Sequence, residues 1–190
     1  PYLPLLLFRS RLPLIRMLEH PEINLKKWDQ RAATSAVYGY FSADAHLYYR
    51  AIFSLLHLHI LLDKPLADGF DAAAGQIYAA LRNGRFFNAI EAAAGARGFR
   101  FEARAAGGTA FRMGDTISAG EASAGPVRLE AQAPFSFLTE IHIVHDGRTI
   151  ASTRDDVLTA EAQGPGVYRV EVFLKERSAL ASDIPWIISN

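Results

Sequence analysis

The second half of the chain, from Phe99 onward, consists of short stretches in which apolar and polar residues alternate. Glycine, proline, aspartate or serine separates these stretches, and Asp146-Gly147 between two of them is a strong hairpin signal. Alternation with a period of two places one face of each strand in a core and the other in water. Seven or eight such strands in about ninety residues are typical of an immunoglobulin-like antiparallel β-sandwich, which we predict for residues 96–190.

One turn in this region has a pattern of its own. The run Gly164-Pro165-Gly166-Val167-Tyr168-Arg169 resembles the corner before a late strand of a sandwich. The Tyr168 hydroxyl can hydrogen-bond back across such a corner. A tyrosine that is simply part of the core would give the same pattern, so both interpretations stay open.

The first half has a different pattern. A helix is predicted from about Asn24 to Thr34, followed by a short buried strand from Val37 to Phe41. An alanine-rich helix over 72–82 and a strand over 85–90 come next. A helix that leads into a buried strand is half of a β/α repeat. We therefore expect an α+β protein with two domains, residues 1–95 and residues 96–190.

Composition narrows the classes of function. The 190 residues carry 20 basic and 20 acidic side chains, so there is no strong signature of nucleic-acid binding. No apolar stretch approaches the roughly 20 residues that a membrane-spanning helix needs. The chain has no cysteine, so any metal site must use histidine, aspartate and glutamate.

Asp44 and His46 follow the predicted Val37–Phe41 strand and are two residues apart. In an extended chain they point to the same side. The pair offers a hard oxygen and a borderline nitrogen, which suits a metal ion, or it offers a base and the group that orients it. The alternative is a loop aspartate that caps a turn beside a half-exposed histidine.

Three further residues are candidates for phosphate or metal contacts. His57 and His59 alternate with leucines, so they share one face if the segment is a strand. They are either ligands or ordinary residues on the polar side of a half-buried strand. Arg50 can hold a phosphate, or it can be a surface ion-pair partner. We name Arg50 and His59 as substrate-binding candidates, and no residue is assigned a catalytic role.

Several motifs, in this order, resemble one family. They are Trp28-Asp29, Ser42-Ala43-Asp44-Ala45-His46, Leu58-His59-Ile60-Leu61-Leu62, Ala79-Ala80-Leu81-Arg82-Asn83-Gly84-Arg85-Phe86-Phe87, Gly164-Pro165-Gly166-Val167-Tyr168-Arg169-Val170-Glu171-Val172 and Pro185-Trp186-Ile187-Ile188-Ser189-Asn190. Together they resemble the C-terminal part of the PHP (polymerase and histidinol phosphatase) metal-dependent phosphoesterases, in the branch with an appended β-sandwich.

This resemblance implies a distorted β/α barrel that holds divalent metal ions, which are zinc, manganese or iron. Asp44 and His46 match the aspartate and histidine of the family's last metal-binding motif, while Ala43 stands where a serine is usual. The early His-x-His motif and the middle ligands have no counterpart in residues 1–30. Residues 1–95 are thus expected to be the C-terminal fragment of a PHP-type barrel, and the chain reads as a piece of something longer. The metal site is expected to be incomplete.

The expected function is a part in the hydrolysis of phosphate esters by metal-activated water. The substrate is a phosphorylated small molecule or a phosphodiester, and the remaining part of the PHP domain comes from the same or another chain. The fragment alone is expected to be inactive. The alternative is a non-catalytic binding or assembly module that consists of a degenerate barrel fragment and a β-sandwich.

Overall fold

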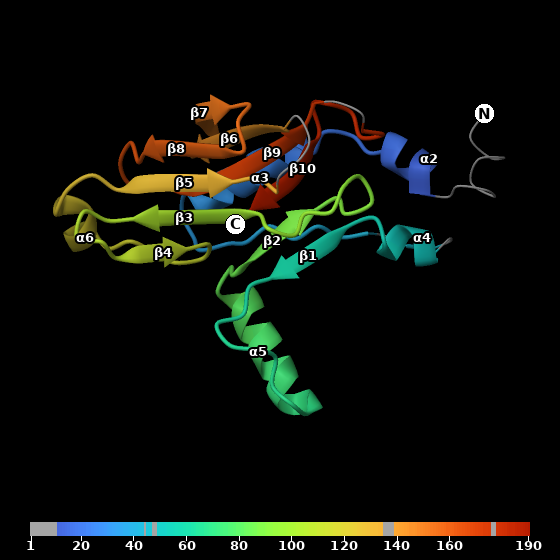
Figure 1. Cartoon of the computed structure of the whole chain (residues 1–190), viewed down its shortest axis with the longest axis horizontal. Coiled ribbons are helices and arrows are strands. Elements are labelled where there is room, and N and C mark those ends of the chain that lie inside the picture. The colour runs from blue at the N-terminus through green and yellow to red at the C-terminus, as the bar shows by residue number, and fades with distance from the viewer. Residues whose placement is uncertain (1–10, 44, 47–48, 135–138, 176–177) are drawn as a thin grey trace.

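The computed structural model describes residues 11–43, 45–46, 49–134, 139–175 and 178–190. Its strands form two antiparallel sheets, one with the order β1-β2-β10-β9-β6-β7 and one with the order β4-β3-β5-β8 (Figure 1). The strands are β1 (His57–Ile60), β2 (Phe86–Ala89), β3 (Arg100–Arg104), β4 (Ala110–Arg112), β5 (Arg128–Gln132), β6 (Thr139–His145), β7 (Arg148–Thr153), β8 (Val157–Glu161), β9 (Tyr168–Leu174) and β10 (Pro185–Ser189). The helices are α2 (Arg11–Arg16), α3 (Glu22–Ala32), α4 (Tyr49–Phe53), α5 (Phe70–Arg82) and α6 (Ala119–Ser123).

The two sheets share one apolar core. Ile141 and Val172 from the six-stranded sheet belong to the same buried cluster as Leu129 and Leu158 from the four-stranded sheet. Burial alternates along β5 and along the first half of β6, as the alternation in the sequence predicts, whereas β9 is buried on both faces. The antiparallel sheets expected after Phe99 are confirmed.

The six-stranded sheet contains strands from both halves of the chain. Ala89 of β2 lies opposite Ile187 of β10, and β1 pairs with the other edge of β2. Residues 1–95 and 96–190, which we expected to be two domains, thus contribute strands to the same sheet. The described strands close no barrel. The PHP-type barrel fragment therefore stays a prediction.

The strand expected at Val37–Phe41 is not formed. Residues 37–43, which we call the strap, have no partner strand in the described chain. Their backbone groups bond instead to the side chain of Asn88 in β2 and to that of Asn190, the residue after β10. An apolar run rich in β-forming residues favours extended backbone, but its composition does not reveal whether a neighbouring strand is present to pair with it.

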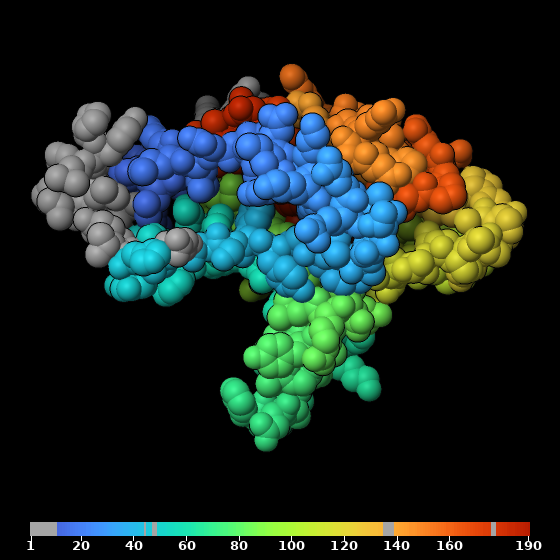
Figure 2. All heavy atoms as spheres, turned by 180° about the vertical axis from the view of Figure 1, so that it is seen from behind, coloured from blue at the N-terminus to red at the C-terminus, as the bar shows by residue number. Residues whose placement is uncertain are grey.

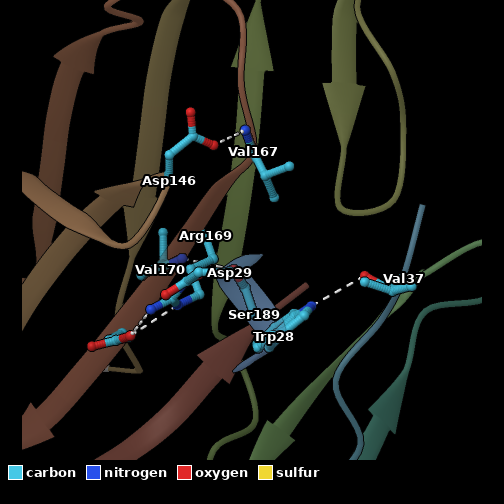
Figure 3. A network of polar contacts seen from close by, with 9 residues as sticks. Trp28, Asp29, Val37, Asp146, Val167, Arg169, Val170 and Ser189 are labelled. Carbon is cyan, nitrogen blue, oxygen red and sulfur yellow. Dashed lines mark hydrogen bonds and ion pairs between the residues drawn. The ribbon is translucent and has the colours of Figure 1, made fainter. Parts of the chain in front are cut away.

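Two helices differ in how they meet the sheets. Trp28 and Asp29 of α3 contact the face of the six-stranded sheet that points away from the core (Figure 3). Helix α5 projects from the body of the molecule, as both overall views show (Figures 1 and 2). No helix in the described ranges is long and apolar enough to span a membrane.

Candidate metal motif and adjoining cavity

Two asparagine side chains hold the strap, which leads to Asp44 and His46, by hydrogen bonds. Asn88 is 1% exposed; its Oδ1 accepts a hydrogen bond from Phe41 N at 2.7 Å, and its Nδ2 donates to Gly39 O at 2.9 Å. Gly39 N donates to Asn190 Oδ1 at 2.8 Å. The two amide side chains therefore give the strap the hydrogen bonds that a neighbouring strand would otherwise provide.

Aromatic side chains fix the strap on both of its sides. Trp28 Nε1 donates to Val37 O at 3.1 Å (Figure 3), and a Cβ on Gly39 would meet the Trp28 ring at 3.0 Å. Tyr40 stacks on Phe86 with ring centroids 4.6 Å apart, and its hydroxyl donates to Leu81 O at 2.9 Å. The strap thus leaves the sheet at a fixed place, shortly before the Asp-Ala-His motif.

The structure describes only one of the two expected metal ligands. His46 is described and exposed, whereas Asp44 lies outside the described residues. No three of the His, Asp and Glu side chains in the described ranges lie close enough together to hold a metal ion. Zinc sites have about four donors, and two-metal sites need more. The described residues alone therefore do not form a complete metal site.

His59 has a well-defined local environment. Its ring stacks on Phe87 with centroids 4.5 Å apart and planes 6° apart, and its Nε2 lies 2.9 Å from Glu91 Oε2. The same carboxylate oxygen accepts a hydrogen bond from Ala96 N at 3.2 Å. His59 and Glu91 each keep 25% of the side chain exposed. The histidine is thus held by Phe87 and Glu91, whereas His57 on the same strand is exposed.

Arg50, the other candidate for substrate binding, lies in the first turn of α4, four residues after His46. Its side chain is exposed, and it forms no ion pair with the part of the chain that the structure describes. The guanidinium is therefore accessible from solvent. No hydrogen bond or ion pair joins Arg50 to His59 in the part of the chain that the structure describes.

A half-open cavity of about 450 Å³ lies beside the strap. Its apolar walls come from Leu25 and Trp28 of α3, from Phe41, and from Ile188 of β10. Asn88 lies in the wall, but its amide is already bonded to the strap, so it offers little to a ligand. Ser42, two residues before Asp44, lies at the edge of the cavity. The cavity is thus lined by mostly apolar side chains and suits an apolar group, and it includes Ser42, which precedes the candidate metal motif in the sequence.

A buried arginine joins α3 to the sheet. Arg169 of β9 is 6% exposed, and its Nε donates to Glu171 Oε1 at 2.8 Å. Its guanidinium also bonds to Asp29 and lies 5.5 Å from the centre of the Trp28 ring (Figure 3). The contact fixes Trp28, which in turn forms one wall of the cavity and supports Gly39 of the strap.

Sequence reasoning did not find the residues that build this site. Asn88, Asn190 and Arg169 had no assigned role, although each has a weak signal in the sequence. An amide within the apolar run Phe86-Phe87-Asn88-Ala89-Ile90 must find partners when buried. Arg169 and Glu171 alternate with Val170 and Val172, which indicates a second, polar face on a buried strand.

Comparison of the chain with models of protein families, with curated proteins and with solved structures finds no match. The resemblance to the PHP family therefore rests on the ordered motifs of the sequence.

Proposed function

We propose that this chain supplies two ligands, Asp44 and His46, to the metal centre of a PHP-type phosphoesterase. The other donors belong to the remaining part of the PHP domain, in the same or another chain. The observation that carries the proposal is that side-chain hydrogen bonds hold the strap in place. Asn88 and Asn190 hold residues 39–41 in place, and the chain then continues to an exposed His46.

The chemistry of the pair agrees with this role. A carboxylate and an imidazole two residues apart provide two donors from one short segment, and zinc, manganese and iron all accept this combination. Two donors bind an ion weakly, so the chain alone is expected to bind metal in the millimolar range and to hydrolyse nothing. Arg50 is the proposed contact for the substrate phosphate because it is exposed and close to His46 in the chain. The His59 Nε2 atom is already bonded to Glu91. His59 can therefore contact the substrate phosphate only if its imidazole is shared with that carboxylate.

The proposal is tested by nuclear magnetic resonance of the whole chain during titration with Mn²⁺, which broadens signals of nearby nuclei. We expect broadening to begin at residues 43–46, and to disappear from that segment in Asp44→Ala and in His46→Ala. The matched control is His57→Ala, which removes another exposed histidine and should leave the pattern unchanged. Broadening elsewhere first, or an unchanged pattern in the two ligand variants, would overturn the proposal.

A second function is favoured by the cavity. In this alternative the chain is a binding module, and its fold is an immunoglobulin-like sandwich. Strand order supports this fold because β5 pairs with β8, while β6, β9 and β10 are neighbours in the other sheet. The Tyr168 hydroxyl donates to Gly164 O at 2.7 Å at the start of β9, as in the tyrosine corner of such domains.

The binding-module alternative predicts that the cavity takes an uncharged aromatic molecule such as naphthalene. Its volume of about 450 Å³ lies within the range of small-molecule sites. Replacing Leu25 with Trp would fill the cavity and abolish naphthalene binding without unfolding the sheets. Equal binding by this variant and the unaltered chain would contradict the assignment.

A further inference from the structure

Helix α5 has one attached side and one unpartnered side. Gln76 accepts a hydrogen bond from Ala67 N at 2.7 Å and donates to Pro65 O at 3.2 Å, so the preceding loop packs along one side. Tyr40 binds the C-terminal turn through Leu81 O, and Gly84 lies directly against the Tyr38 ring. The helix is therefore anchored at its base and along one side, and it projects into solvent in a fixed direction (Figures 1 and 2).

The unpartnered side carries a line of four residues, Asp71, Gly75, Tyr78 and Arg82, at spacings of four, three and four. These spacings place all four on one helix face. Tyr78 is 60% exposed, and Asp71, Gly75 and Arg82 are also exposed.

The charges on this line pair neither with each other nor with the described part of the chain. Asp71 and Arg82 are separated along the helix by about 16 Å, which is too far for an ion pair. Within the described ranges neither side chain forms an ion pair. Each end of the line therefore presents a charge that has no ion-pair partner among the described residues, and the two charges have opposite sign.

The shape of the line is complementary to itself. A Cβ placed on Gly75 would have no atom within 4 Å, so the surface above this residue is open. Tyr78 lies one turn away and projects an aromatic ring from the same line. If two copies of α5 pack antiparallel about a two-fold axis, Asp71 faces Arg82 of the second copy and Gly75 faces Tyr78 of the second copy. Each copy then makes two ion pairs and two ring-on-glycine contacts with the other.

We propose that the exposed face of α5 is a homodimer interface, in which two copies of the chain pack their α5 helices antiparallel. A two-fold interface requires one patch to be complementary to itself, and this line meets the requirement in both charge and shape. The contact is small because the helix is only about 20 Å long, so the dimer is weak, with dissociation in the micromolar range or above. This inference is independent of the metal motif.

The experiment is sedimentation equilibrium of the full chain at concentrations from about 10 μM to about 1 mM. We expect dimerisation, weakened at least about tenfold by Asp71→Arg and by Arg82→Asp, because each variant turns two attractions into two repulsions. A one-to-one mixture of these two variants should dimerise again, since every pair in the mixed dimer joins opposite charges. The control is Arg97→Asp, which reverses an exposed charge away from α5 and should change nothing.

Gly75→Leu separates association from folding. Leucine favours the helix over glycine by roughly 0.5–1 kcal/mol, so the variant should be at least as helical by circular dichroism. Its side chain closes the space that receives Tyr78, so dimerisation should weaken. A monomer at all concentrations, or two single variants that fail to dimerise when mixed although the unaltered chain dimerises, would overturn the proposal.

Discussion

At the scale of single residues, Glu140 is a titratable group whose carboxylate is held by two positively charged or hydrogen-bonding neighbours. His142 Nε2 lies 2.7 Å from Glu140 Oε1, and Lys175 Nζ lies 3.1 Å from Oε2. The hydrogen bond from His142, with help from Lys175 and against the effect of burial, holds the pKa of the Glu140 carboxyl below its ordinary 4.5. The folded state therefore prefers the carboxylate more strongly than the unfolded state does.

The expected result is a loss of stability in acid. Because the folded pKa is the lower one, the stabilisation is complete above pH 4.5 and declines as the pH falls through the folded pKa. Glu140→Gln should reduce the decrease in unfolding free energy between neutral pH and pH values below 4.5, as measured by urea denaturation. Glu130→Gln, at an exposed site on the other sheet, is the control. An unchanged pH dependence in Glu140→Gln would contradict the assignment.

Some residue-level features were predictable because their cause is local. The hairpin at Asp146-Gly147 is confirmed: both residues have positive φ, 47° and 79°, which this dipeptide accommodates. The bond of the Tyr168 hydroxyl back across its corner is confirmed as well. The role of Asn88 was not predictable, because its partners are Gly39 and Phe41, nearly fifty residues away in the chain.

At the scale of elements, α3 shows how a helix with a weak apolar face can be held on a sheet. None of its residues is buried, and its attachment depends on Trp28 and Asp29, which contact Arg169. Removing one partner from a buried ion pair costs more than removing both, because a single charge is left without compensation.

Replacing Arg169 with Leu is therefore expected to lower the unfolding free energy by about 3–5 kcal/mol, since Glu171 remains buried without its cation. The double variant Arg169→Leu/Glu171→Leu should lose less than the single one. Chemical denaturation monitored by circular dichroism measures both, with exposed Arg128→Leu as the control. A double variant less stable than the single one would show that the charge of Glu171 is not the source of the loss.

One secondary-structure prediction from the sequence, the strand at Val37–Phe41, was wrong. The run from Val37 to Phe41 has the composition of a buried strand, but it lies as a strap held by side-chain amides. Composition reports a preference for extended backbone, whereas strand formation also requires a neighbour with free hydrogen-bonding groups. By contrast, α5 was predicted close to its observed bounds because its alanines and the Asn83-Gly84 stop act locally.

At the scale of the whole molecule, the strands of the first half complete the larger sheet. Ala89 pairs with Ile187 across nearly one hundred residues, a contact that no local pattern predicts. The sequence did predict the antiparallel strands of the second half, because alternation is a local signal. The same sheet carries Asn88 on β2 and ends next to Asn190, so it holds the strap that leads to Asp44 and His46.

We propose that the sheet, by holding the strap through Asn88, favours metal binding by Asp44 and His46. The most direct measurement compares the Mn²⁺ dissociation constants of the chain and of Asn88→Ala, under conditions in which both are folded. Asn88→Ala keeps both proposed ligands but frees the strap, so ordering the segment costs more on binding. We predict Mn²⁺ binding several-fold weaker in Asn88→Ala and unchanged in the exposed control Asn24→Ala. Equal Mn²⁺ affinity in Asn88→Ala and in the unaltered chain would contradict the claim.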